Sequence, residues 1–259
     1  MLDYSFTYAE LELFLLVLVR VASFVFIAPF FSMSNTPRHV RVLLSVFITI
    51  LIYRIIPHSG YEYSTYLQYL LLILKEVMTG LIIGFGANIA MMIVNFAGHI
   101  ADMEMGLSMV TLMDPATRQS VTITGVYYNY MVLLLMLISG MHRYLLSALV
   151  ETYTLIPISG QVFHMNRLLS GILQFMGDYV LIGFRICLPI FATMIILNAI
   201  LGVLAKISPQ LNMFAVGIQI KVLVGLGILF ISSMMLPDAA NMIYDEMKQM
   251  IVTMVQAMS

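Results

Sequence analysis

Residues 99–120 read HIADMEMGLSMVTLMDPATRQS and stand between two long apolar stretches. The segment contains four charged residues and four methionines: Asp102, Glu104, Asp114 and Arg118, with Met103, Met105, Met109 and Met113. Charged side chains are costly in hydrocarbon, so this segment cannot be an ordinary lipid-facing span. It predicts a connector between hydrophobic helices that is enclosed by protein or exposed to water.

The composition indicates a membrane protein. Hydrophobic residues make up 61% and charged residues 10% of the 259 positions, and the mean hydropathy is +1.00. Soluble domains typically carry about 25% charged residues, so we expect a bilayer protein or part of an assembly of membrane-inserted subunits. The net charge of −1 offers no electrostatic basis for nucleic-acid binding. The single cysteine, Cys187, excludes an internal disulfide and a cysteine-rich zinc site.

Apolar runs of helical length predict an all-α chain of about six to eight helices joined by short connectors. The runs cover residues 11–31, 42–56, 66–98, 126–139, 144–158, 168–204 and 214–236. Residues 237–259 predict an amphipathic helix. Pro209 lacks an N–H and is expected to separate the last two apolar runs. The sequence has no fixed-period repeat, and a single domain over residues 1–259 is predicted.

Charged residues lie within or at the edges of these apolar runs, where each costs at least about 2.5–3.5 kcal/mol if it faces lipid. They are Arg20, Lys75, Glu76, Asp178, Arg185, Lys206 and Lys221. Three interpretations stay open. The long side chains could snorkel to the interface, which suits Arg20 and Lys221 taken singly. The charges could form an ion relay in a transporter, or the helices could face other subunits or an aqueous conduit.

Spacing adds some detail to the last interpretation. Asp178 and Arg185 are seven residues apart, so they share a helix face but are too distant to pair within the helix. Lys75 and Glu76 are adjacent and diverge by about 100 degrees, so they are expected to meet different neighbours. Each charge then needs a partner on another helix or chain, which favours an assembly with polar seams.

Small residues predict close helix packing in several places. The glycines concerned are Gly80, Gly84, Gly86, Gly225 and Gly227, while Gly202 stands shortly before the expected break at Pro209. No nucleotide loop, nucleophile elbow or paired metal-ligand spacing is recognisable. His99, Asp102 and Glu104 could in principle touch a cation, but polar groups at a helix end explain them more simply. No catalytic, metal or cofactor residue is therefore expected.

The methionines of the opening segment have a regular spacing. Met105, Met109 and Met113 lie four residues apart and would line one stripe if the segment were helical. Met adapts to irregular gaps, so the stripe is either a soft seal or ordinary core filler. Gly106 gives backbone freedom, and Asp114 before Pro115 favours a turn or a helix start. We expect Asp102 and Glu104 to face polar or wet surroundings.

Two motifs resemble a known family. They are AGHIADMEMGLSMVTLMDP at residues 97–115 and LGVLAKISPQLNMFAVG at residues 201–217, supported by RVASFVFIAPFFS at 20–32 and PRHVRVLLS at 37–45. In this order, and over essentially the whole chain, the sequence resembles the FliR/SctT family of type III export-gate proteins. The first motif resembles the flagellar members more than the injectisome members.

The resemblance implies a FliP-like part over about residues 1–165 fused to a FliQ-like part over about 166–259. It implies a pore-forming export gate in the bacterial inner membrane, at the flagellar basal body. The expected partners are FliP-like, FliQ-like, FlhB-like and FlhA-like proteins and unfolded flagellar substrates, with no cofactor. The alternatives are an injectisome SctT-type subunit, or a secondary transporter with an intramembrane charge relay.

The resemblance also assigns roles to residues. A loop that plugs the closed pore would fall at residues 106–122. Its residues here are Met105, Gly106, Met109, Met113, Asp114, Pro115 and Arg118. Polar seams or subunit contacts would involve Arg20, Lys75, Glu76, Asp178, Arg185, Lys206, Pro209, Gln210, Asn212 and Lys221. A simple solvated turn at residues 206–212 is the alternative for the second motif.

Overall fold

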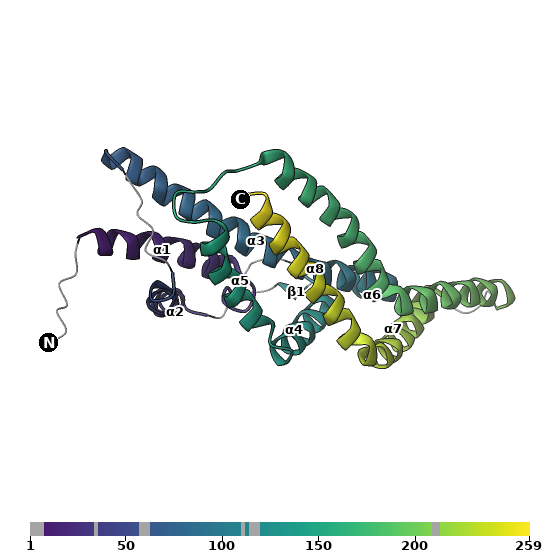
Figure 1. Ribbon diagram of the computed structural model, residues 1–259. Coiled ribbons are helices and arrows are strands. Elements are labelled where there is room, and N and C mark those ends of the chain that lie inside the picture. The colour runs from purple at the N-terminus through teal and green to yellow at the C-terminus, as the bar shows by residue number, and fades with distance from the viewer. Residues whose placement is uncertain (1–7, 34–35, 57–62, 110–111, 114–119, 209–212) are drawn as a thin grey trace. The chain divides into compact units, whose positions relative to one another are not determined.

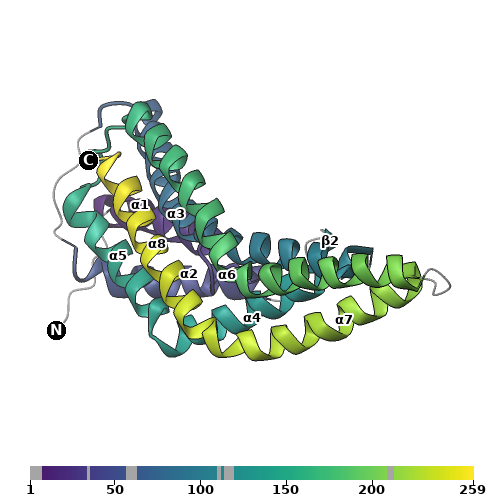
Figure 2. The ribbon, with the colours of Figure 1, turned by 90° about the vertical axis from the view of Figure 1, so that its right-hand side faces the viewer.

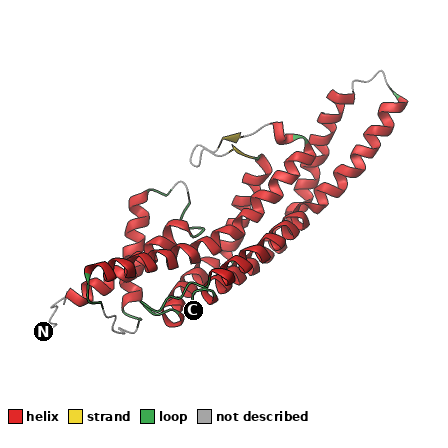
Figure 3. Ribbon diagram, turned by 90° about the horizontal axis from the view of Figure 1, so that it is seen from above, coloured by secondary structure: helices red, strands yellow, loops and turns green. Residues whose placement is uncertain are grey.

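The computed structural model describes residues 8–33, 36–56, 63–109, 112–113, 120–208 and 213–259 (Figures 1 and 3). In this part of the chain the α-helices are α1 (Tyr8–Ile27), α2 (Arg38–Tyr53), α3 (Tyr66–Met105), α4 (Ile123–Ile138), α5 (Met141–Leu155), α6 (Met165–Ile207), α7 (Met213–Ser232) and α8 (Leu236–Gln256). Two short 3-10 turns, η1 (Leu107–Met109) and η2 (Ser233–Met235), and a pair of two-residue strands, β1 (Leu112–Met113) and β2 (Ser120–Val121), complete the described elements. The predicted all-α fold is confirmed.

Each apolar run and the amphipathic tail forms a helix, because a 3.6-residue repeat satisfies all backbone groups within one segment. The break between α6 and α7 lies where Pro209 predicted it, although Pro209, Gln210 and Asn212 are outside the described residues. The C-terminal part of α6 before this break and α7 after it run side by side as an antiparallel hairpin (Figure 2). Pro189 lies inside α6 without ending it.

Three helices of the described residues are long and apolar enough to cross a membrane. They correspond to residues 66–105, 165–207 and 216–256, and α4 with α5 could provide a fourth span. The share of side chains buried within the chain differs between them. It is 61% for the most apolar window of α3, but 22% for that of α6 and 17% for that of the α7–α8 stretch. The last two therefore leave most of their apolar surface uncovered by this chain.

The chain divides into two compact units. Unit 1 comprises residues 1–90, 140–174 and 246–259, and unit 2 comprises residues 91–139 and 175–245. These units do not coincide with the FliP-like and FliQ-like parts, whose boundary near residue 165 stays a prediction.

In unit 1, α1 supplies much of the core, with Leu16, Val21 and Phe24 fully buried. Helix α3 approaches α1 at two glycines: a Cβ at Gly80 would lie 2.3 Å from the carbonyl oxygen of Arg20, and one at Gly84 would lie 3.1 Å from that of Phe24. The C-terminal residues are held by backbone hydrogen bonds. The N–H of Val162 donates to Met258 at 3.1 Å and that of His164 to Ala257 at 2.9 Å.

In unit 2, the second half of α3 packs on the start of α4 through glycines. A Cβ at Gly98 would lie 2.3 Å from the Cα of Gly125, so the two backbones are nearly in contact. The predictions of close packing are confirmed for Gly80, Gly84, Gly86 and Gly225. The prediction is wrong within this chain for Gly227, around which a Cβ would meet open space, as it would around Gly202. A small residue permits close packing, but it does not require it.

The contact between Gly98 and Gly125 gives a direct test. Replacing Gly98 by Ala must push α3 and α4 apart, so the variant should lose about 1–3 kcal/mol of stability, seen as a lower thermal unfolding midpoint in detergent. Gly202→Ala is the matched control, because the same methyl group meets nothing there. The control should leave the midpoint unchanged or raise it slightly, since Ala favours helix over Gly. Equal midpoints for both variants would contradict the assigned contact.

Candidate functional site

The segment between α3 and α4 does not continue the helix. Helix α3 ends at Met105, and Gly106 follows with φ +77°. This left-handed conformation suits glycine and stops a helix, after which η1 makes a single tight turn. The predicted stripe of Met105, Met109 and Met113 along one helix is therefore wrong, because Gly106 ends the helix after the first of them.

Met105 itself belongs to the core of unit 2. Its side chain is fully buried and lies against Gly225 of α7, where a Cβ would come within 2.6 Å of the Met105 sulfur. Met194 of α6 approaches the same position. For Met105 the core-filler interpretation holds. Asp114, Pro115 and Arg118 lie outside the described residues, and for Met109 and Met113 the structure describes only the backbone.

A buried carboxylate joins the two ends of this segment. Asp102 is 1% exposed, and its Oδ2 accepts the N–H of Thr124 at 3.0 Å while Oδ1 accepts the Thr124 hydroxyl. Of the polar or wet surroundings expected for Asp102, the structure shows the polar ones, and the side chain is shielded from water. The reason is that the first turn of α4 offers unpaired N–H groups and a positive dipole end, which stabilise a carboxylate away from water.

Further hydrogen bonds reinforce the same place. Thr122 is the N-cap of α4, and its hydroxyl accepts the N–H of Gly125 at 3.2 Å. Just before it, β1 pairs with β2 in an antiparallel ladder that matches Met113 with Ser120. Asp102 and Thr124 are 22 positions apart in the chain. The two ends of the intervening segment are thus fixed to each other by a buried, charge-assisted contact.

A second buried network lies in unit 1 and centres on Arg20. Its Nε donates to Oε2 of Glu76 at 2.5 Å and its Nη2 to Oε1 at 3.1 Å, so the ion pair is bidentate. The remaining amine, Nη1, donates to the carbonyl of Ile156 at 3.1 Å. The guanidinium also lies 4.2 Å from the ring centre of Tyr153.

This arrangement corrects the interpretation of Arg20 as a snorkelling side chain. Arg20 is 0% exposed, and it is neutralised by Glu76 on another helix rather than by an interface. Glu76 also accepts the side-chain amide of Gln161 at 2.5 Å. A bidentate pair with extra hydrogen bonds satisfies groups that would otherwise be very costly to bury. The network ties α1, α3 and the end of α5 together.

The other intramembrane charges behave differently. Among these seven charges, Arg20 and Glu76 form an ion pair with each other. Lys75, Asp178 and Lys221 are half-buried, and Arg185 and Lys206 are exposed. That Asp178 and Arg185 find partners on a neighbouring helix or chain stays a prediction.

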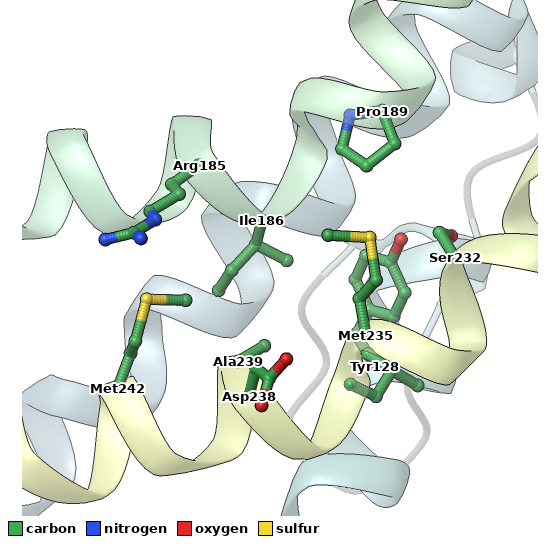
Figure 4. A pocket seen from close by; sticks show the side chains of 10 residues that line it. Tyr128, Arg185, Ile186, Pro189, Ser232, Met235, Asp238, Ala239 and Met242 are labelled. Atoms are coloured by element: carbon green, nitrogen blue, oxygen red, sulfur yellow. The ribbon is translucent and has the colours of Figure 1, made fainter.

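One cavity of about 300 Å³ in unit 2 brings together residues that the sequence did not connect. Arg185 and Pro189 of α6 and Asp238 of α8 line it with Tyr128 and two methionines (Figure 4). Tyr128 is almost fully buried, whereas Asp238 is exposed. The described residues contain no cluster of three metal-ligating side chains.

Sequence reasoning missed Thr124, Gln161 and Asp238. A threonine shortly after a charged loop is a usable N-terminal helix signal, so Thr124 could have been singled out. Gln161 and Asp238 carry no such local signal, because their roles depend on side chains far away in the chain.

The fold and these sites define a class of protein. It is a membrane-embedded helical subunit that has buried polar contacts in its core and apolar helices that this chain leaves largely exposed. Comparison with known proteins is consistent with this class. The model of the family "Bacterial export proteins, family 1" matches residues 11–247, and the chain belongs to this family.

Its relatives carry more particular names. The flagellar biosynthetic protein FliR of Escherichia coli is 30% identical over 85% of this chain and 83% of its own length. The protein of the same name from Buchnera aphidicola of Acyrthosiphon pisum is 27% identical over 92% of this chain and 95% of its own. The surface presentation of antigens protein SpaR of Shigella flexneri is 24% identical over 90% of this chain and 91% of its own.

The Arg20–Glu76 pair predicts a large effect of a small change. Glu76→Gln keeps the shape but leaves a buried guanidinium without its counter-charge, so stability should fall by about 3–5 kcal/mol. Lys75→Gln, one position earlier and half-buried, is the matched control and should change little. Exchanging both partners, as Arg20→Met with Glu76→Met, should recover most of the loss. Thermal unfolding of the chain, purified together with the subunits that accompany it from the membrane, measures all three, and a mild effect of Glu76→Gln alone would count against the role of the pair.

Proposed function

We propose that the chain is a structural, pore-forming subunit of the flagellar type III protein export gate, located in the bacterial inner membrane at the flagellar basal body. The observation that carries this proposal is family membership over residues 11–247, together with relatives named for flagellar biosynthesis that match along most of their length. The chain then acts by assembly and passage of substrate, without catalysis of its own.

Assembly with other subunits is supported by surfaces that the chain does not cover. Helices α6 and α7 expose long rows of large apolar side chains, including Leu181, Leu188, Leu223 and Phe230. Exposed charges on the same hairpin, such as Arg185 and Lys206, favour contact with polar groups over pure lipid. We assign these faces to FliP-like and FliQ-like subunits, with FlhB-like and FlhA-like proteins acting on the same gate and unfolded flagellar proteins as its substrates.

We propose that the loop at residues 106–122 seals the closed channel. Its fixed ends support this role, because Asp102 with Thr124 and the buried Met105 hold both ends while Gly106 lets the chain leave the helix sharply. The plug residues are Gly106, Met109, Met113, Asp114, Pro115 and Arg118, with Met105 as the anchor below them. Flexible thioethers suit a seal that must yield to many substrates.

A second candidate is an injectisome export-gate subunit, favoured by the similarity to SpaR over 90% of the chain. The flagellar assignment is preferred because the relatives of higher identity are flagellar. A secondary transporter with a charge relay is less well supported, because Glu76, one of the charges proposed for the relay, is engaged in a bidentate ion pair with Arg20.

Co-purification tests the proposed function. Affinity purification of the full chain from its native membrane should recover FliP-like and FliQ-like proteins in a stable complex, whereas the chain expressed alone should aggregate. The measurement is mass spectrometry of the eluate combined with size-exclusion chromatography. A stable, monodisperse chain that binds a small solute by itself would contradict a gate subunit and favour a transporter.

Ion leakage tests the seal. In the assembled complex, deletion of residues 107–121 should raise passive ion flux across the membrane, because the pore loses its plug. Asp102→Ala should give a smaller rise, since it releases the loop ends at a cost of about 1–3 kcal/mol in lost hydrogen bonds. Glu104→Gln, two positions away and half-buried, is the control and should not leak. Unchanged flux in the deletion variant would rule out the sealing role.

A further inference from the structure

A groove lies in unit 1 between α5 and the last turns of α8. Near the start of α5, Lys248 lies 5.7 Å from the ring centre of Tyr144, and after the end of α5 the N–H of Val162 donates to Met258. The two helices therefore run side by side in the same direction (Figures 1 and 2). On α5 the groove extends from Tyr144 to Leu155, which is about 16 Å or three helical turns.

Apolar side chains form most of the groove. Ala148, Ile251 and Val255 are buried and lie at its floor. Leu155 and Val252 line the same space but are 60% and 45% exposed, so they form its outer walls. The volume of about 190 Å³ is below the usual range of ligand pockets, about 300–1,000 Å³. A space of this size and shape suits aliphatic side chains inserted from another polypeptide better than a small molecule.

The helix faces on both sides of the groove are polar. Arg143, Ser147 and Glu151 recur every four residues along the exposed side of α5. Gln249 and Gln256 are exposed on α8. Charged side chains are costly when they face hydrocarbon, so this side of unit 1 is not a lipid-facing surface. The groove consequently opens to water or to the polar surface of another protein.

Glu151 gives the groove its charge. Its exposed side chain lines the groove, and no other lining residue has a charged side chain. The ammonium of Lys248 lies over Tyr144, about two helical turns away along α5. A complementary surface therefore places a Lys or Arg opposite Glu151 and apolar side chains beside it. An anionic lipid headgroup does not fit, because its phosphate would meet this carboxylate.

We propose that this groove is a docking site for an amphipathic helix of another protein. The helix carries aliphatic side chains at positions i and i+4, with a Lys or Arg within one turn of them. A helix laid into an apolar groove is a recurrent mode of recognition, and its anchors follow this spacing. The aliphatic anchors contact Ala148 and Val255, and the basic side chain pairs with Glu151.

The proposed docking site is separate from the faces of α6 and α7 assigned to partner subunits. All residues that line it belong to unit 1. The proposal does not rest on the export role, because it uses only the shape and charge of this surface. A complex that retains FliP-like and FliQ-like subunits but binds no helix in the groove would overturn the docking site alone.

Site-specific crosslinking in native membranes tests the proposal. A photoreactive benzoylphenylalanine replaces Val252 on the exposed wall of the groove, and mass spectrometry identifies the crosslinked peptide. We expect an adduct with a helical segment of another protein that has the stated spacing of aliphatic and basic residues. The same probe at Leu43, which is exposed on α2 and does not line the groove, should not capture this segment.

Other outcomes of the crosslinking experiment would overturn the proposal. They are an adduct with lipid, an adduct with a second copy of this chain, an adduct with a segment that lacks the expected pattern, and the absence of any adduct at Val252. Recovery of the co-purifying subunits shows separately whether the complex has assembled.

Charge reversal locates the contact at Glu151. Glu151→Lys should lower the yield of the Val252 adduct about five- to tenfold, because a repulsion replaces an attraction. Changing the captured Lys or Arg of the partner to Glu should restore the yield in this variant. Ser147→Lys, one turn earlier on the same exposed face and outside the groove lining, is the matched control and should keep the wild-type yield.

A milder variant covers the case in which Glu151→Lys does not assemble. Glu151→Gln removes the charge at nearly constant size and should lower the yield less than the reversal does. An equal loss in Ser147→Lys, or an unchanged yield in both Glu151 variants, would contradict the assigned contact.

Discussion

The bidentate pair of Arg20 and Glu76 is the constraint on which unit 1 depends. A guanidinium without any exposed surface is tolerable only if its charge and its donors are satisfied in place. Glu76 of α3 does this together with Tyr153 and Ile156 at the end of α5. Arg20 and Glu76 can satisfy each other only when they lie face to face, so the pair fixes the register of α1 against α3. The close approach at Gly80, next to Arg20, follows from the same geometry.

Unit 2 uses the same principle with a different acceptor. Asp102 finds its partners at the start of α4, where helix N–H groups need an acceptor and the helix dipole favours an anion. This contact holds the end of α3 to the start of α4. The close approach of Gly98 to Gly125 keeps the two helices near enough for the contact to form. Both units thus pair polar groups inside and leave apolar helix faces outside. This arrangement suits a subunit of a larger membrane assembly.

Helix positions could be predicted from the sequence, because an apolar run bounded by charged or proline residues satisfies its own backbone only as a helix. The break near Pro209 could also be predicted, because proline has no backbone N–H to continue the helix. The pairing of Arg20 could not be predicted, since Glu76 is 56 positions away and each charge read alone suits the membrane interface. The prediction of a methionine stripe along one helix was wrong for a local reason. Gly106 adopts a left-handed conformation and stops the helix, and a glycine at this position is a signal that the sequence contains. Gln161 and Asp238 gain their roles only when distant segments meet, which spacing does not encode.

The composition of unit 1 has a consequence for truncated chains. Its three pieces are residues 1–90, 140–174 and 246–259, so segments far apart in the sequence form one core. Backbone hydrogen bonds from Val162 and His164 reach Met258 and Ala257 in the last of these pieces. A chain cut before residue 246 would therefore lack one piece of this core and both of these acceptors, while the Arg20–Glu76 pair lies wholly within the first piece.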